Sequence, residues 1–223
     1  MKRILVFLAA SLLFYGGRSY SQSLGTKQLD FGIKGGINIA SFTWKSEFKR
    51  EQREEYNTKY KPQILFNIGG YANYSLTEAI SLQGGLSISG KGYKETWTDT
   101  WGGLSGFSEE VKSSESLFYL EIPVNAVYHY KNFYAGAGPY FSYGLLGIWK
   151  WKSPSESASG NAFDEDDDGH RRVDFGAKLQ AGYRVNNKIS VGLEYGLGLT
   201  KLDPEWDDSP RNSVFSISLG YWF

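Results

Sequence analysis

The sequence predicts an all-β fold: an eight-stranded antiparallel up-and-down transmembrane β-barrel, with short turns at one end and long loops at the other. Three observations carry this prediction. The last residues alternate strictly, with Phe215, Ile217, Leu219, Tyr221 and Phe223 separated mostly by small or polar residues. A closed barrel pairs such a strand with the first one, whereas a soluble protein would leave it as an open edge. Similar alternation recurs along the chain, and the connections between these segments alternate in length.

The N-terminal residues have the features of a secretory signal peptide. Two basic residues precede an apolar run over residues 4–15, and small residues just before position 22 suit cleavage. The run is too short to span a bilayer as a helix. We therefore expect residues 1–21 to be a cleaved signal peptide and residues 22–223 to form one outer-membrane β-barrel domain. An uncleaved N-terminal anchor is the alternative.

The composition excludes several classes of function. The chain has 24 Lys and Arg, 24 Asp and Glu, and no cysteine. This balance of charge is not that of a nucleic-acid-binding protein. Without cysteine, neither a disulfide framework nor a thiolate metal site can form. After the N-terminal run, the chain has no apolar stretch long enough for a transmembrane helix, so a membrane-spanning form must be a barrel.

Eight segments alternate with period two and are predicted as strands. They cover about residues 30–42, 64–74, 80–91, 117–128, 133–148, 173–184, 189–200 and the segment that ends at Phe223. A tilted strand crosses a bilayer in roughly 9–11 residues, which these lengths allow. Three connections are short (75–79, 129–132 and 185–188), and four are long and polar (43–63, 92–116, 149–172 and 201–212). Short periplasmic turns and long extracellular loops are typical of outer-membrane barrels.

The charges in the middle of strands indicate which face looks inward. They are Lys34, Glu121, Lys178 and Glu194, and the opposite face of each strand is uncharged. A charge facing lipid costs about 2–4 kcal/mol at the midplane, so we expect these four residues in the lumen. Eight strands leave an interior just wide enough for side chains, where unpaired ions would be costly. We predict a lumen charge cluster that plugs the barrel; a gated pore or proton path through it is the alternative.

The tryptophans predict aromatic girdles at both membrane surfaces. Six lie in the long connections, namely Trp44, Trp97, Trp101, Trp149, Trp151 and Trp206. At the opposite rim lie Trp222 and Phe223, together with Tyr128, Tyr130 and Phe133 beside a short turn. Aromatic packing within the loops themselves is the alternative.

Several motifs resemble a known family. The first strand reads FGIKGGIN over residues 31–38, the third contains LQGGL over 82–86, the fourth contains YLEIP over 119–123, and YAGAGPY follows over 134–140. With these motifs the chain resembles the PorT-like outer-membrane β-barrel family of Gram-negative bacteria over nearly its whole length after the signal peptide. The resemblance implies the barrel architecture and says little about activity. It leaves a link to protein secretion open.

One loop contains a candidate metal site. Asp164, Asp166 and Asp168, followed by Gly169, match the opening of an EF-hand calcium loop, D-x-D-x-D-G. The bidentate Glu required at the twelfth position is absent, and Phe175 is there instead. We keep the three aspartates as candidate cation ligands, with a solvated acidic loop as the alternative.

Catalytic groups are hard to assemble from this sequence. The chain has two histidines, His129 and His170, and lacks a G-x-S-x-G motif. A nucleophile with a positioned base, which a lipid-active barrel enzyme would need, is therefore not predicted, and no cofactor is expected.

The predicted function is that of an integral outer-membrane barrel of a Gram-negative bacterium, with a closed lumen and a structural or interaction role through its extracellular loops. A small-solute or ion pore is the alternative, and a lipid-active enzyme is less favoured. The expected partners are outer-membrane lipid and lipopolysaccharide, the barrel-assembly machinery through the strand that ends in Phe223, and an unidentified extracellular or secretion-system protein, but no nucleic acid.

Overall fold

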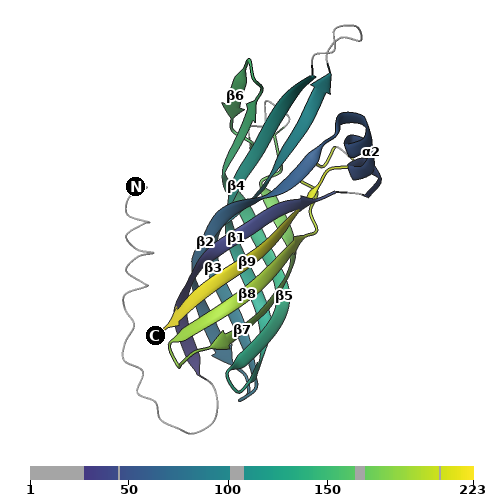
Figure 1. Cartoon of the computed structure of the whole chain (residues 1–223). Helices are drawn as coiled ribbons and strands as arrows, with labels where there is room; N and C mark the ends of the chain where they lie inside the picture. The colour runs from purple at the N-terminus through teal and green to yellow at the C-terminus, as the bar shows by residue number, and fades with distance from the viewer. Residues whose placement is uncertain (1–27, 45, 101–107, 164–168, 206) are drawn as a thin grey trace.

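The computed structural model describes residues 28–44, 46–100, 108–163, 169–205 and 207–223 of a tall β-barrel (Figure 1). The predicted signal peptide lies outside these ranges and stays a prediction. The elements, in chain order, are β1 (Leu29–Thr43), α2 (Ser46–Tyr56), β2 (Lys59–Ser75), β3 (Ile80–Thr100), β4 (Ser108–Tyr130), β5 (Phe133–Lys152), β6 (Ser157–Gly160), β7 (Val173–Arg184), β8 (Ile189–Gly198) and β9 (Arg211–Trp222).

Eight strands close into one antiparallel ring, as the sequence predicts. The ring runs through β1–β5 and β7–β9, and β1 closes it by pairing with β9, while β6 is a short addition to β5. At this seam Gly36 lies opposite Ser218 and Ile37 opposite Ile217. The last residue also takes part, because the backbone N–H of Phe223 donates to the carbonyl oxygen of Phe31 at 2.9 Å. The terminal strand is thus paired on both sides, which removes the open edge.

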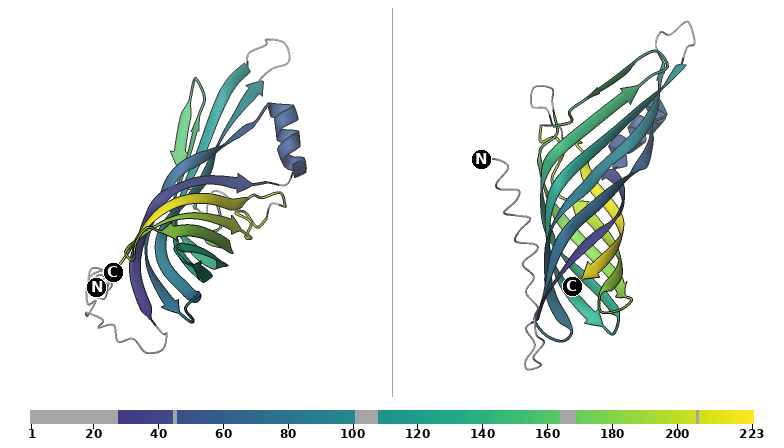
Figure 2. Two further views of the ribbon diagram at one scale, coloured as in Figure 1. Left: turned by 60° about the horizontal axis from the view of Figure 1, so that its bottom comes forward. Right: turned by 90° about the vertical axis from the view of Figure 1, so that its left-hand side faces the viewer.

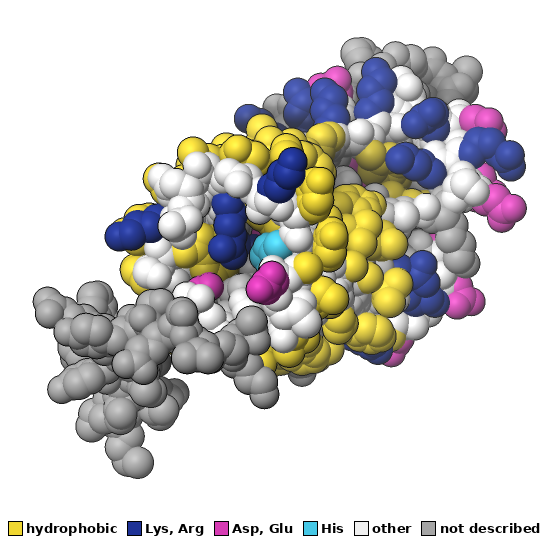
Figure 3. All heavy atoms as spheres, turned by 90° about the horizontal axis from the view of Figure 1, so that it is seen from below, with side chains coloured by type: hydrophobic (Ala, Val, Ile, Leu, Met, Phe, Trp, Pro, Cys, Tyr) yellow, Lys and Arg dark blue, Asp and Glu magenta, His cyan; other side chains and the backbone are white. Residues whose placement is uncertain are grey.

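Side chains alternate between the outer surface and the lumen along the wall strands. Ile33, Phe66 and Leu179 face outward and are 52%, 50% and 57% exposed, whereas the neighbouring Lys34 and Lys178 are buried inside. Figure 3, which views the molecule from below, shows hydrophobic side chains over much of the outer surface and charged groups at the centre of this end. A surface this apolar is matched by the hydrocarbon of a bilayer. The orientation is the one that the strand charges predict.

Strands β2 to β5 extend well beyond β7, β8 and β9 at the end opposite the short turns (Figure 2). β3 and β4 stay paired in unbroken register from Ser87 opposite Glu121 to Thr100 opposite Ser108. The long polar connection over 92–116 is therefore a hairpin for most of its length, as the sequence reasoning expected of this loop above the membrane. The reason is that backbone hydrogen bonds extend a hairpin into water whenever a paired neighbour continues, even where both faces carry polar residues.

One helix, α2, interrupts the first long connection. Acidic Glu47 in its first turn and basic Arg53 in its last turn both complement the helix dipole.

Among the residues described, no helix combines the length and the apolar character needed to cross a membrane.

Candidate functional site

Among the described residues, six buried side chains that carry a formal charge come from five strands and lie in the lumen. They are Lys34 on β1, Lys91 on β3, Glu121 on β4, Asp174 and Lys178 on β7, and Glu194 on β8, each at most 9% exposed. Successive side chains of a strand point to opposite faces, and each of these six lies on the face that also carries other buried polar residues. All six therefore point inward. The structure therefore brings the four predicted residues together and adds two that the sequence reasoning did not include.

These six groups form a single chain of alternating charge, which we call the charge ladder. The ammonium nitrogen of Lys34 lies 3.1 Å from Oε1 of Glu194, whose Oε2 lies 3.6 Å from Nζ of Lys178. Lys178 also pairs with Oε1 of Glu121. Oε2 of Glu121 lies 3.1 Å from Nζ of Lys91. The ladder ends at Asp174.

Asp174 and Lys91 complete the balance of charge. Nζ of Lys91 lies 2.9 Å from Oδ2 of Asp174, so the ladder has three cations and three anions. The sequence reasoning missed this pair because Lys91 is the last residue of its predicted strand and Asp174 is the second of its own. In the period-two alternation of their strands, both residues fall on the same face as the other inward-pointing residues. That position could have identified them from the sequence. Restricting the search to mid-strand charges excluded them.

Neutral groups satisfy much of the remaining hydrogen-bonding capacity of the ladder. Nζ of Lys34 donates to the amide oxygens of Gln83 at 2.9 Å and Gln180 at 3.2 Å, and it lies 4.4 Å from the centre of the Tyr71 ring. The Tyr140 hydroxyl donates to Oδ2 of Asp174 at 3.1 Å. Buried charges are tolerated only when paired and hydrogen-bonded in this way.

A cluster of buried hydrophobic residues, which we call the apolar cap, lies on the extracellular side of the ladder. Its buried members are Phe42, Tyr93, Leu117, Tyr119, Ala162, Phe163 and Leu202. The ring of Phe163 contacts that of Tyr119 edge-on, with centroids 5.6 Å apart. A Cβ at Gly144 would come within 2.5 Å of the Phe163 ring, so the glycine permits this approach. Arg172 holds the segment in place by donating to the carbonyl oxygens of Gly144 and Phe163, both at 3.2 Å.

His170 attaches the same segment to β4. Its Nε2 lies 2.7 Å from Oε2 of Glu115, and its ring contacts Phe42 edge-on. Burial lowers the pKa of His170, but the hydrogen bond and charge of Glu115, together with the charge of Asp203, outweigh burial and raise that pKa overall. The pair therefore favours the protonated imidazole.

Glu95→Gln should remove a pH dependence from the extracellular sheet. Burial and the neighbouring Glu115 carboxylate raise the pKa of Glu95 from 4.5 to about 7. The folded state then binds this proton more tightly than the unfolded chain, so stability falls as the pH rises from about 4.5 to about 7, by roughly 1–3 kcal/mol. Hydrogen exchange of β3 and β4 amides, corrected for intrinsic rates, should show protection falling with pH in the wild type. If protection in Glu95→Gln fell with pH as much as in the wild type, Glu95 would not be the source of the pH dependence.

Three tryptophans pack toward the interior, although the girdle prediction placed them at the membrane surface. Trp222 is 5% exposed, and its Nε1 donates to Oγ of Ser190 at 3.1 Å inside the periplasmic end of the lumen. Trp44 and Trp149 pack against the apolar cap. The girdle prediction was wrong for these three, because strand parity and packing decide the direction of a ring more than its position along the strand. Tyr128, Tyr130 and Phe133, which the same prediction included, are exposed on the outer wall near the periplasmic end. Trp101 and Trp206 lie outside the described residues.

A serine and a histidine meet at the periplasmic opening of the lumen. Oγ of Ser81 lies 2.8 Å from Nε2 of His129 and donates to Oδ1 of Asn73 at 2.7 Å. The serine proton is therefore directed at the amide oxygen rather than at the imidazole. Ser81, His129 and Asn73 thus form one hydrogen-bonded network at this opening.

The candidate cation ligands Asp164, Asp166 and Asp168 lie outside the described residues, and their role stays a prediction. Among the residues that are described, no group of three or more histidine, aspartate or glutamate side chains is placed to hold a metal ion.

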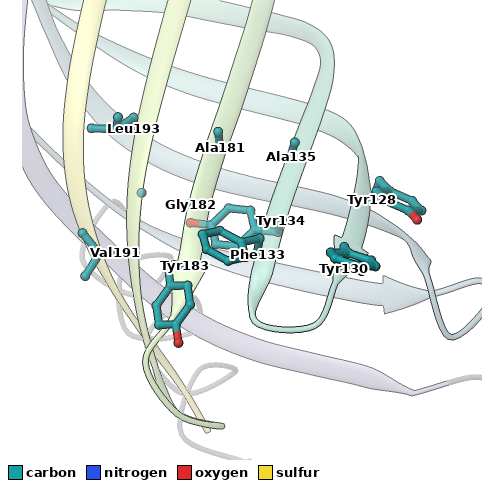
Figure 4. A pocket seen from close by; sticks show the side chains of 11 residues that line it. Tyr128, Tyr130, Phe133, Tyr134, Ala135, Ala181, Gly182, Tyr183, Val191 and Leu193 are labelled. Atoms are coloured by element: carbon teal, nitrogen blue, oxygen red, sulfur yellow. The ribbon is translucent and has the colours of Figure 1, made fainter.

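A shallow groove lies on the outer wall near the periplasmic end (Figure 4). Ala135 and Ala181 leave space between the larger rings of Tyr128, Phe133 and Tyr183. Its lining is almost entirely apolar, and it opens on the surface that faces hydrocarbon. The residues that line it include no acidic, basic or histidine side chain.

Comparison with known proteins identifies the family. Residues 20–203 match the family model described as outer membrane protein beta-barrel domain. No curated protein sequence matches the chain.

Solved structures with a similar fold have low sequence identity. Ail, the attachment invasion locus protein of Yersinia pestis, is 15% identical, with 87% of this chain and 98% of that chain covered and a TM-score of 0.42. Neisserial surface protein A is 11% identical, with coverage of 86% and 97% and a TM-score of 0.42. Escherichia coli outer membrane protein W is 13% identical, with coverage of 87% and 97% and a TM-score of 0.34. The family match spans most of the sequence and agrees with the closed ring of strands and its apolar outer band, so the chain belongs to the outer membrane protein beta-barrel domain family and resides in the outer membrane.

Proposed function

We propose that this protein is a closed outer-membrane barrel of a Gram-negative bacterium, which acts through its extracellular part rather than by conducting solutes. The observation that carries the proposal is the charge ladder, in which six buried ions of alternating sign occupy the lumen of an eight-stranded wall. A passing ion would have to break these pairs in a space just wide enough for side chains. The apolar cap above the ladder, whose buried members are mostly hydrophobic, would add a second closure.

The extracellular part is large enough for an interaction role. The hairpin of β3 and β4, the added strand β6 and helix α2 project from the barrel end and expose charged side chains. Long surface elements on a rigid scaffold are common sites of binding. We propose that a protein or glycolipid of the cell surface contacts this part, and that the strand ending in Phe223 is recognised during barrel assembly. The PorT-like branch and its link to secretion stay predictions.

The wild-type barrel should give no single-channel current in a planar bilayer. Lys178→Ala with Glu194→Ala should introduce a leak, because the pair of substitutions removes two adjacent ions of opposite sign from the ladder and separates Lys34 from its ion-pair partner, while the net charge of the lumen stays the same. Glu78→Ala with Lys188→Ala is the matched control, since it removes the same two charges from exposed turns.

Folding of each variant is checked by its shift in gel migration on boiling. Steady conductance by the wild type would establish the pore alternative instead. Silence of both double variants would mean that the cap, not the ladder, closes the lumen.

A further inference from the structure

Six lysines occupy one face of the extracellular sheet. In one cross-strand row Lys61 lies opposite Lys94, Lys94 opposite Ser114 and Ser114 opposite Lys150. In the next row Lys59 lies opposite Thr96, Thr96 opposite Lys112 and Lys112 opposite Lys152. Residues paired across strands point to the same side of a sheet, and residues two apart along a strand share a face. All six lysines are exposed, and we call this surface the lysine face.

The lysine face is strongly positive. Of the acidic side chains described on these strand segments, Glu110 faces the same way, and its Oε1 lies 2.8 Å from Nζ of Lys112. Glu95 and Glu115 belong to the opposite face, where they lie beside the apolar cap. The two rows are about 7 Å apart along the strands, and neighbouring strands are about 4.8 Å apart. Six cations within so small an area repel one another unless an anion lies among them.

The position of the lysine face indicates which anion this is. Directly below it on the same outward face come Ser116 and Ile148, which are paired, and then Phe118 and Leu146, which are also paired. Phe118 contacts Phe66 on β2, with ring centroids 5.5 Å apart, and Phe66 is half exposed on the lipid-facing surface. The lysines therefore begin within two rows of the apolar band. This is the level at which the polar groups of the outer leaflet meet a barrel.

We propose that the lysine face binds the phosphate groups of a phosphorylated glycolipid of the outer leaflet. The lysine face turns away from the barrel axis, so a ligand approaches it from the side where lipid lies. Lysine suits this role because its long apolar stem can lie along hydrocarbon while its ammonium group reaches the headgroup. A soluble polyanion would meet the same charges without the apolar band, which is why a lipid is the better match. The inference rests on the membrane location and is independent of whether the lumen is closed.

Replacing Lys94, Lys112, Lys150 and Lys152 with glutamine tests the proposal. The folded protein in an uncharged detergent is titrated with diphosphoryl lipid A, and the bound lipid is counted by native mass spectrometry. The variant should bind lipid A roughly tenfold more weakly or worse, since each lysine near an anionic surface contributes a sizeable share of the attraction. Binding by the wild type should weaken as salt is added.

The matched control replaces Arg50, Arg53, Lys131 and Lys188 with glutamine, because these four exposed cations lie on α2 and in the periplasmic turns. It should bind lipid A as the wild type does. Inositol hexakisphosphate, a soluble polyphosphate, is the second probe and should compete poorly with lipid A. If both quadruple variants lost lipid A binding equally, the loss would be explained by the change in net charge alone. The lysine face would then not be the binding site. Equal affinity of the wild type for the soluble probe would overturn the choice of a lipid.

Discussion

Glu121→Gln should lower the free energy of unfolding by about 3–5 kcal/mol, because it leaves two buried cations without their shared anion. Glu121 is 2% exposed and sits between Lys91 and Lys178 in the charge ladder. Glutamine has nearly the same shape as glutamate, so the loss is one of charge and not of packing. Of the substitutions in the ladder this one should be the most damaging, since Lys178 keeps only the longer contact to Glu194.

The measurement is denaturant unfolding of the barrel in lipid vesicles, followed by tryptophan fluorescence and by gel migration without boiling. Glu110→Gln is the control, because the Glu110 side chain is 61% exposed in its pair with Lys112, and solvent-exposed ion pairs contribute little to stability. Adding Lys178→Gln to Glu121→Gln should recover part of the loss, which a double-mutant cycle quantifies. Equal losses for Glu121→Gln and Glu110→Gln would contradict the assignment of the ladder as a structural element.

Gly36→Ala should open the seam of the barrel and lower the free energy of unfolding by at least about 2 kcal/mol. A Cβ at Gly36 would lie 2.1 Å from the carbonyl oxygen of Ile217 and 2.8 Å from Cα of Ser218. Both are backbone atoms of β9, so the clash cannot be relieved by rotating a side chain. The seam joins the first and last strands, and moving β9 there disturbs the closure of the whole ring.

Gly70→Ala is the matched control, since a Cβ at Gly70 would meet no atom within 4 Å. That variant should be neutral or stabilised by up to about 1 kcal/mol, because alanine has fewer conformations in the unfolded chain. Vesicle unfolding curves and the fraction of heat-shifted protein on gels measure both variants. Similar unfolding midpoints for Gly36→Ala and Gly70→Ala would show that the seam tolerates separation.

Strand parity made the ring and its two faces predictable from the sequence. Period-two alternation separates Lys34 from Ile33 and Ile37, and the high energy of a charge in hydrocarbon decides which set faces inward. The same logic identified Lys34, Glu121, Lys178 and Glu194 as lumen residues, although it could not say which pairs would form. Pairing depends on how the strands are staggered around the ring, and that stagger is set by contacts between residues far apart in the chain.

The remaining features depend on long-range packing that no local pattern encodes. Phe163 lies in a stretch expected to be a polar loop, and only the folded arrangement brings it to Gly144 and Tyr119. Trp222 has the inward parity of its strand, yet its terminal position suggested a membrane-surface residue.

The uninterrupted register of β3 and β4 has a mechanical consequence. The two strands run as one hairpin from the level of Glu121 to Thr100 and Ser108, a rise of about 45 Å at 3.3–3.4 Å per residue. A load applied at the upper end would be carried along both strands and shared among many backbone hydrogen bonds at once. The paired strands should therefore resist bending. A partner bound near Thr100 and Ser108 would transmit force directly to the part of β3 and β4 that lies in the membrane.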